Sequence, residues 1–207
     1  MTKPRQLWML VGGNGAGKST FYRLYLQPLG VPFVNADVLA RVDYPGAPEA
    51  HSYEAAKLAE DQRNNFLLRG LSFCFETVYS HPSKVDVVGH AKALGYQVIM
   101  VMIHLQSPSL NQARISERVS EGGHDVPRDK VVSPIPRMLN HVETSLPLCD
   151  VARVYDNRSA DQPVRPVFTL KHGSIERHWN PFPDWAAALL TERSPNPGYL
   201  PASGSSA

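Results

Sequence analysis

The sequence is poor in cysteine and only weakly charged. Its 207 residues include two cysteines, Cys74 and Cys149, whose positions match no metal-binding spacing. So few cysteines argue against a disulfide framework and fit a reducing compartment, and Cys74 lies in an apolar run typical of the core. The 21 basic and 19 acidic residues leave a net charge of +2 without any Lys/Arg run. This composition does not favour nucleic acid as the main partner.

Long apolar runs are also missing near the N-terminus. The first apolar stretch, Leu7–Val11, is shorter than a signal-peptide core or a membrane span. Apolar residues make up 43% of the chain, which is enough for a sizeable core in one domain. We therefore expect a soluble protein that works in the cytoplasm.

Short apolar runs alternate with segments whose apolar residues recur at helical spacing. The pattern predicts strands over residues 6–11, 32–35, 71–77, 96–105 and 151–155. It predicts helices over residues 17–25, 47–69, 84–94, 109–119 and 128–146, the last broken at Pro134 and Pro136. This alternation indicates an α/β fold, a parallel sheet of about five strands with helices on both faces.

A glycine-rich segment lies between the first predicted strand and the first predicted helix. It matches the pattern G-x-x-x-x-G-K-S/T, which chance produces in roughly one chain in a hundred of this length. Glycines let backbone N–H groups wrap around phosphate oxygens, Lys18 reaches the β- and γ-phosphates, and the Ser19 hydroxyl can bind magnesium. A turn that binds nothing is the alternative. The strand before it and the helix after it favour an ATP site, formed by Gly12, Gly13, Asn14, Gly15, Ala16, Gly17, Lys18, Ser19 and Thr20.

The rest of the sequence narrows the class of nucleotide enzyme. The N-K-x-D motif that binds guanine is missing, which argues against a GTPase. The third predicted strand ends near one carboxylate, Glu76, and lacks the Asp-Glu pair expected of a motor-type ATPase. A P-loop kinase that uses ATP and Mg²⁺ to phosphorylate a small molecule fits best.

Two carboxylates follow strands whose carboxyl ends are expected to meet near the P-loop. Asp37 can accept the proton of the acceptor hydroxyl, or it can cap the helix that follows it. Glu76 can hold magnesium or bind the acceptor, or it can make a structural bond only. Further candidate contacts with the acceptor follow at the same edge: Thr77, Tyr79 and Ser80.

Cations suited to stabilising a transferred phosphate flank a glycine-rich segment at residues 121–127: Arg114, Arg118, Arg128 and Arg137. The first two are four residues apart on a predicted helix and share one face. The arrangement predicts a lid near residues 118–137 that closes over the phosphates, although a solvated helix with a surface loop has the same pattern. His124 is either a contact of this lid or an ordinary loop residue.

Prolines become dense after Asp156, and this scatter does not suit a second core. We expect residues 1–157 to form the kinase core and residues 158–201 a small C-terminal appendage on the same domain. Residues 202–207 are expected to be a disordered tail. The appendage is predicted to contain one strand and one short helix, over residues 167–171 and 181–192.

These motifs together resemble the zeta toxin family of P-loop kinases, in particular its shorter bacterial branch. The matching pieces occur in the family's order: Gly12–Thr20, Phe33–Asp37, Phe75–Thr77, Arg118–Val119, Gly122–Pro127, Arg137 and Tyr155–Asn157. The P-loop is specific by itself, whereas the others are specific only as a set.

The resemblance implies a nucleoside-kinase-like fold, ATP and magnesium. It implies that Asp37 is the base, that Glu76 lies in the acceptor site and that Arg118 is the first lid arginine. The second lid position has three competing matches, of which the first is favoured: Arg137, Arg128 and His124. The best studied members phosphorylate a sugar hydroxyl of UDP-N-acetylglucosamine, which blocks cell-wall synthesis, and a small helical antitoxin covers their ATP site.

The predicted function is therefore transfer of the γ-phosphate of ATP to a hydroxyl of a nucleotide sugar such as UDP-N-acetylglucosamine. A housekeeping kinase for another sugar, a nucleoside or a polynucleotide end is the alternative enzyme. A binding module in which ATP only shapes a surface needs neither a base nor a lid arginine. A small antitoxin is the partner that the resemblance implies, and neither a membrane nor nucleic acid is expected.

Overall fold

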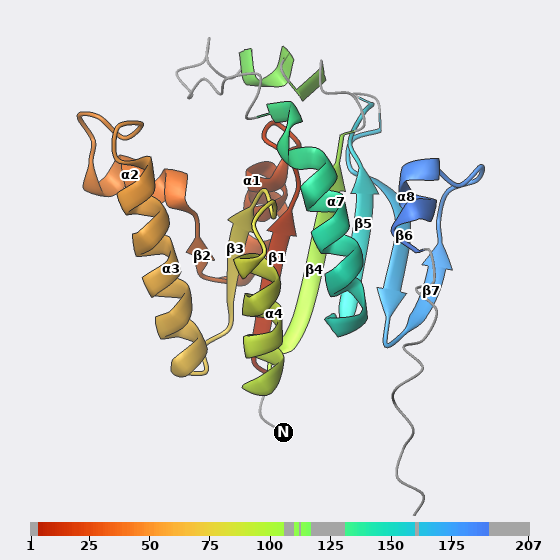
Figure 1. Ribbon diagram of the computed structural model, residues 1–207, viewed down its shortest axis with the longest axis horizontal. Helices are drawn as coiled ribbons and strands as arrows, with labels where there is room; N and C mark the ends of the chain where they lie inside the picture. Colours follow the sequence, from red (N-terminus) through yellow and green to blue (C-terminus); the bar gives the residue numbers. More distant parts are fainter. Residues whose placement is uncertain (1–3, 106–109, 112, 117–130, 160–161, 191–207) are drawn as a thin grey trace, which may run out of the picture.

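The centre of the protein is a mixed β-sheet. The computed structural model describes residues 4–105, 110–111, 113–116, 131–159 and 162–190. Seven strands lie in the order β2-β3-β1-β4-β5-β6-β7, with β1 between β3 and β4 (Figure 1). The strands from β2 to β5 in this order run parallel, and β6 and β7 are antiparallel additions at one edge.

The parallel part alternates strands with helices, as predicted. Its first half consists of β1 (Gln6–Val11), α1 (Lys18–Phe21), a π-helical turn (Tyr22–Leu26), a 3-10 turn (Gln27–Leu29), β2 (Phe33–Val34), α2 (Ala36–Asp43) and α3 (Ser52–Leu68). Its second half consists of β3 (Phe73–Thr77), α4 (Ser83–Ala93), β4 (Gln97–His104), α7 (Pro134–Ser145), a 3-10 turn (Leu146–Leu148) and β5 (Val151–Asp156). The predicted α/β fold class is confirmed.

Successive side chains of each central strand bury opposite faces of the sheet. On one face, Leu7 and Met9 belong to a large apolar cluster that includes residues of α3, α4 and α7. On the other face, Leu10 packs with Phe21 and Leu26 in a smaller cluster that also contains Cys74. Burial on both faces explains why β4 is an almost uninterrupted apolar run.

The C-terminal region widens the sheet beyond the predicted five strands. β6 (Arg165–Lys171) pairs with β5, and β7 (Ser174–Arg177) pairs with β6. α8 (Asp184–Ala188) contributes Ala186 to the large apolar cluster. The predicted strand and helix are therefore present. β7 was missed because its four residues are all exposed and show no apolar alternation. The predicted tail, 202–207, lies outside the described residues.

The predicted break in the helical stretch 128–146 falls just before α7. Ser133 is a turn residue, and Pro134 is the first residue of α7, where a missing N–H removes no helical hydrogen bond. In the described ranges, every helix is too short or too polar to span a bilayer.

Candidate active site

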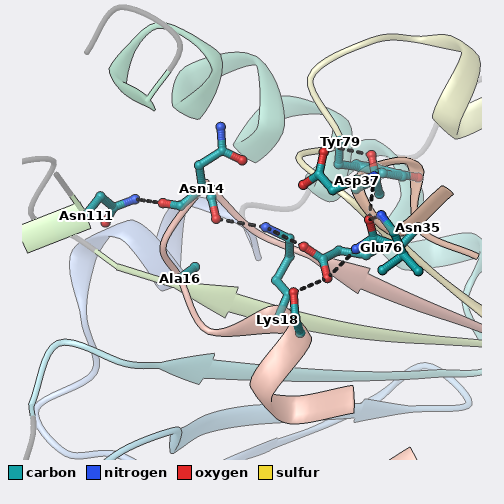
Figure 2. A network of polar contacts seen from close by, with 12 residues as sticks. Asn14, Ala16, Lys18, Asn35, Asp37, Glu76, Tyr79 and Asn111 are labelled. Carbon is teal, nitrogen blue, oxygen red and sulfur yellow. Dashed lines mark hydrogen bonds and ion pairs between the residues drawn. The ribbon is translucent and has the colours of Figure 1, made fainter. Parts of the chain in front are cut away.

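Residues that are distant in the sequence meet at the carboxyl edge of the sheet. The P-loop leaves β1, Asp37 follows β2, and Glu76 lies near the end of β3. These three strands are neighbours and run parallel, so their carboxyl ends face the same side. Figure 2 shows Lys18 with Asn35, Asp37 and Glu76 grouped beside it.

Two P-loop glycines are required by both conformation and space. Gly15 and Gly17 have φ values of 77° and 101°, a region that favours glycine. A Cβ on Gly15 would lie 2.9 Å from the backbone oxygen of Asn111, and one on Gly17 would lie 2.7 Å from the side-chain amide of Asn157. The loop is thus packed closely against two other segments of the chain.

Two buried asparagine side chains hold the backbone of the P-loop. Asn111 Nδ2 donates to the carbonyl of Asn14 at 2.9 Å, and Asn157 Nδ2 donates to the carbonyl of Ala16 at 2.8 Å. In a trans peptide the C=O and the next N–H point in opposite directions. The N–H groups that follow these two carbonyls therefore point away from the asparagines, free for another acceptor.

Sequence analysis did not predict a role for either asparagine. Asn157 Oδ1 accepts from the N–H of Val164 at 3.0 Å, which fixes the orientation of its amide. A polar residue directly after a buried strand was the available signal for Asn157. Asn111 carried no signal, and its Oδ1 is buried without a hydrogen-bond partner among the described residues.

Lys18 lies between the P-loop and Glu76. Its side chain is only 4% exposed, its Nζ donates to the carbonyl of Gly13 at 2.9 Å, and it lies 3.5 Å from Glu76 Oε1. A buried ammonium needs such partners, because an isolated charge away from water is strongly unfavourable. The contacts hold one positive charge at the centre of the site.

Glu76 joins the P-loop to the segment after β2. Its Oε2 accepts from Ser19 Oγ at 2.7 Å and from Asn35 Nδ2 at 3.0 Å (Figure 2). The structural bonds of Glu76 are therefore present, and its role at the magnesium or in the acceptor site stays a prediction.

The oxygens of Ser19 and Glu76 suit Mg²⁺. This ion prefers oxygen ligands, and it usually takes one or two from protein and the rest from phosphates and water. No group of three or more His, Cys, Asp or Glu within the described part of the chain is placed to hold a metal. Magnesium at this position would therefore depend on the phosphates of a nucleotide.

Asn35, and not Asp37, caps α2. Asn35 Oδ1 accepts from the N–H groups of Asp37 and Val38 at 2.8 and 3.2 Å. The alternative in which Asp37 serves only as a helix cap is therefore wrong. The carboxylate of Asp37 is exposed and makes no hydrogen bond or ion pair to the residues that the structure describes. It remains available to a substrate.

The segment after β3 is hydrogen-bonded to the last residue of α7. Tyr79 has a φ of 65°, its side chain is fully buried, and its hydroxyl lies 2.7 Å from Ser145 Oγ. Burial raises the pKa of Tyr79. Its side chain cannot contact the acceptor, so that expectation is wrong. Thr77 Oγ1 accepts from the N–H of Tyr79 at 2.9 Å, and Ser80 is half-buried. Their proposed contacts with the acceptor stay predictions.

His104 ends β4 beside the P-loop strand. Its ring is 4% exposed and lies 4.4 Å from the ring of Trp185, centroid to centroid. Burial lowers the pKa of His104 to about 4, while the nearby Asp156 opposes this shift in part. The histidine is therefore a neutral packing residue at physiological pH.

The described residues include only part of the predicted lid. Arg137 is exposed in the first turn of α7, and Arg114 is half-buried in the helical residues 113–116. The remaining lid candidates lie outside the described residues: Arg118, His124 and Arg128. The assignment of the second lid arginine therefore stays a prediction.

The fold and the site together define a P-loop protein of the kinase class. A glycine-rich phosphate loop follows the central strand of a parallel sheet, and two carboxylates lie at the ends of the neighbouring strands. The family model described as Zeta toxin matches residues 2–161. The chain belongs to the zeta toxin family.

Known proteins resemble this chain at low sequence identity. An uncharacterized protein of Haemophilus influenzae is 28% identical over 134 residues, which are 61% of this chain and 95% of that protein. A chain of the AvrRxo1-ORF1:-ORF2 complex with ATP aligns with a TM-score of 0.67 and 17% identity, over 98% of this chain and 66% of that one. A chain from the PezAT chromosomal toxin–antitoxin system of Streptococcus pneumoniae gives 0.59 and 15%, over 81% and 72%. This chain thus spans slightly less than two thirds of the AvrRxo1-ORF1 complex chain.

Proposed function

We propose that this protein is an ATP-dependent kinase that transfers the γ-phosphate of MgATP to a hydroxyl of a nucleotide sugar such as UDP-N-acetylglucosamine. The free carboxylate of Asp37, at the same sheet edge as Lys18, carries the proposal. A protein that only binds a nucleotide needs no such base. Family membership and the ATP complex of a protein with the same fold support the choice of ATP.

On the donor side, the P-loop N–H groups that point away from Asn111 and Asn157 would bind phosphate oxygens. Lys18 would exchange the carbonyl of Gly13 for oxygens of the β- and γ-phosphates. Ser19 and Glu76 would hold Mg²⁺, which neutralises charge on the phosphates.

On the acceptor side, Asp37 would take the proton of the acceptor hydroxyl. The hydroxyl oxygen then forms a bond to the γ-phosphorus while the bond from that phosphorus to the β,γ-bridging oxygen breaks, which leaves ADP. Arg118 and Arg137 are the proposed lid residues that stabilise the charge on the transferred group. Thr77 and Ser80 are proposed to contact the acceptor.

A small antitoxin protein is the proposed partner, in keeping with the toxin–antitoxin complex among the proteins of similar fold. We also propose a cytoplasmic location, where ATP and nucleotide sugars are both present. These proposals are independent of the kinase chemistry.

The direct test is phosphate transfer from labelled ATP to a panel of nucleotide sugars, followed by mass spectrometry. We expect one added phosphate on the sugar moiety, and its loss in Asp37→Asn. Asp43→Asn is the matched control, because Asp43 is an exposed carboxylate at the last residue of α2. Transfer only to other sugars, nucleosides or polynucleotide ends would support the alternative kinase. Binding of ATP without turnover or transfer would support the interaction module.

A further inference from the structure

Arg63 is a buried cation that forms no ion pair with the residues that the structure describes. Its side chain is 6% exposed, and its Nε makes no hydrogen bond within the described part of the chain. The guanidinium carbon lies 5.3 Å from the centroid of the Phe75 ring, and none of the described residues forms an ion pair with Arg63. Burial lowers the pKa of Arg63, and Glu60 raises it only in part. A buried, unpaired charge is unfavourable in the free protein, so an external anion is the natural partner.

Lys84 is a second cation, on the helix that follows the carboxyl end of β3. It lies in the first turn of α4 and is half-buried. Burial lowers the pKa of Lys84, and the positive charge of Arg63 lowers it further, against a smaller opposing effect of Glu60. The positive charges of Arg63 on α3 and Lys84 on α4 thus repel each other, and one exposed carboxylate, Glu60, opposes the pKa shifts of both.

Arg63 lies beside the carboxyl half of β3, because its guanidinium is over the ring of Phe75, the residue before Glu76. The Phe66 and Phe73 rings lie 5.3 Å apart and Arg63 lies over Phe75, so α3 approaches the carboxyl edge as its residue numbers decrease. Helical side chains tilt toward the helix N-terminus, which on α3 is the direction of that edge. Figure 1 shows α3 and α4 on either side of β3, the strand that carries Glu76.

We propose that Arg63 and Lys84 form a subsite for a phosphate or diphosphate group on the acceptor molecule. The subsite rests on the proposed kinase function, because that function places the acceptor beside Asp37 and Glu76. A planar guanidinium binds phosphate oxygens in pairs, and a lysine adds a movable charge. An acceptor with a diphosphate would compensate both cations, whereas a neutral sugar would leave them unpaired.

The test uses the whole chain with its P-loop already filled. The protein is saturated with Mg²⁺ and AMP-PNP, a non-hydrolysable ATP analogue, and inorganic pyrophosphate is titrated by calorimetry. We expect wild type to bind pyrophosphate, and Arg63→Met and Lys84→Gln to weaken this binding by at least about tenfold, the effect expected for charge-assisted hydrogen bonds. Lys57→Gln is the control, because Lys57 is an exposed cation on the same helix. Affinity for AMP-PNP should stay the same in all variants.

A second arm compares UDP with uridine, which differ only in the diphosphate. Wild type should prefer UDP by at least about tenfold, and Arg63→Met should remove this preference. The melting temperature separates binding from packing: Arg63→Met should raise it in the free protein, since it removes a buried unpaired charge. A lower melting temperature with unchanged pyrophosphate affinity would mean that Arg63 only packs against Phe75, which overturns the subsite.

The two proposals fail in different ways. If wild type binds no pyrophosphate, or if Arg63→Met binds it as wild type does, the anion subsite is wrong even where phosphate transfer is normal. If pyrophosphate binds through Arg63 but no acceptor is ever phosphorylated, the kinase proposal fails while the subsite stands.

Discussion

The two sides of Lys18 differ in how fully their polar groups are paired. On the P-loop side, the carbonyls of Gly13, Asn14 and Ala16 each accept a hydrogen bond from a side chain at 2.8–2.9 Å. On the side proposed to bind the acceptor, the Asp37 carboxylate and the Arg63 guanidinium have no such partner among the described residues. The P-loop side is thus held in place by hydrogen bonds, whereas the other side has one negatively and one positively charged group that remain unpaired among the described residues.

This difference follows from what each side must recognise. The phosphates of a nucleotide present a fixed geometry, and donors that need no rearrangement bind it at the lowest entropic cost. In the proposed reaction, the acceptor side must instead keep a base unpaired until a hydroxyl arrives. The buried, unpaired charge of Arg63 would therefore lower stability in exchange for binding in the proposed subsite, a common arrangement at active sites.

The largest effect is expected from replacing the proposed general base on the acceptor side, Asp37. Asp37→Asn keeps the size of the side chain, but its amide cannot take a proton. We expect phosphate transfer to fall by about 10²–10⁴, the usual contribution of a general base, while ATP affinity is retained. Steady-state transfer and calorimetric ATP binding check this, with Asp43→Asn as the control. Normal transfer by Asp37→Asn would mean that the base lies elsewhere.

A slightly smaller effect is expected from removing the charge between the two sides. Lys18→Ala should reduce turnover by about 10²–10³, because a buried cation no longer stabilises the transferred phosphate. Glu76 would also lose its ionic partner at 3.5 Å, so Lys18→Met, which keeps the buried stem, is a useful companion. Single-turnover rates at saturating ATP measure the effect. Wild-type rates in both variants are the outcome that contradicts the nucleotide site.

A third variant tests whether the P-loop side is preorganised by its asparagines. Asn157→Asp removes the donor to the carbonyl of Ala16 and places a carboxylate beside it. We expect ATP to bind about 10- to 100-fold more weakly, whereas adenosine, which lacks phosphates, should bind as before. Asn64→Asp on the exposed surface of α3 is the control. Equal losses for ATP and adenosine would indicate general damage, and not a specific role in phosphate binding.

The sequence predicted the parts of the site that depend on local motifs and on topology. The P-loop pattern is local, and Asp37 and Glu76 follow neighbouring parallel strands, so their meeting is a consequence of the sheet. Asn157 lies in a segment that matches the zeta toxin family, but the hydrogen bonds of Asn111 and Asn157 were missed because the two residues are 97 and 141 positions from their P-loop partners. No local pattern contains such contacts.

Errors arose where tertiary packing decides the direction of a side chain. Tyr79 follows the active-site strand, but its hydroxyl is bound to Ser145 of α7, so it faces the core. Arg63 lies on the buried face of α3, in the same row as Ala55 and Ala59. Its burial could not be predicted from the sequence, because charged residues are usually exposed. β7 escaped detection because it pairs through its backbone alone and exposes every side chain.

The smallest expected effect concerns the response of the P-loop side to acid. The backbone carbonyl of His104 accepts a hydrogen bond from the N–H of Asn157 at 2.9 Å. Because Asn157 holds the P-loop, a change that destabilises the surroundings of His104 is expected to affect the P-loop as well. Burial lowers the pKa of His104 from 6.5 to about 4. Between these values the unfolded chain binds a proton that the folded protein does not, so stability falls as the pH falls through this window.

His104 should therefore contribute about 1 kcal/mol of lost stability between pH 6.5 and 5.5, with little effect at pH 7 and above. His104→Asn should flatten this part of the profile even if it lowers stability at every pH. Urea unfolding at several pH values measures the slope, and His90→Asn, at an exposed position of α4, is the control. If the wild-type and His104→Asn slopes are equal, His104 is not the group that makes the P-loop side sensitive to acid.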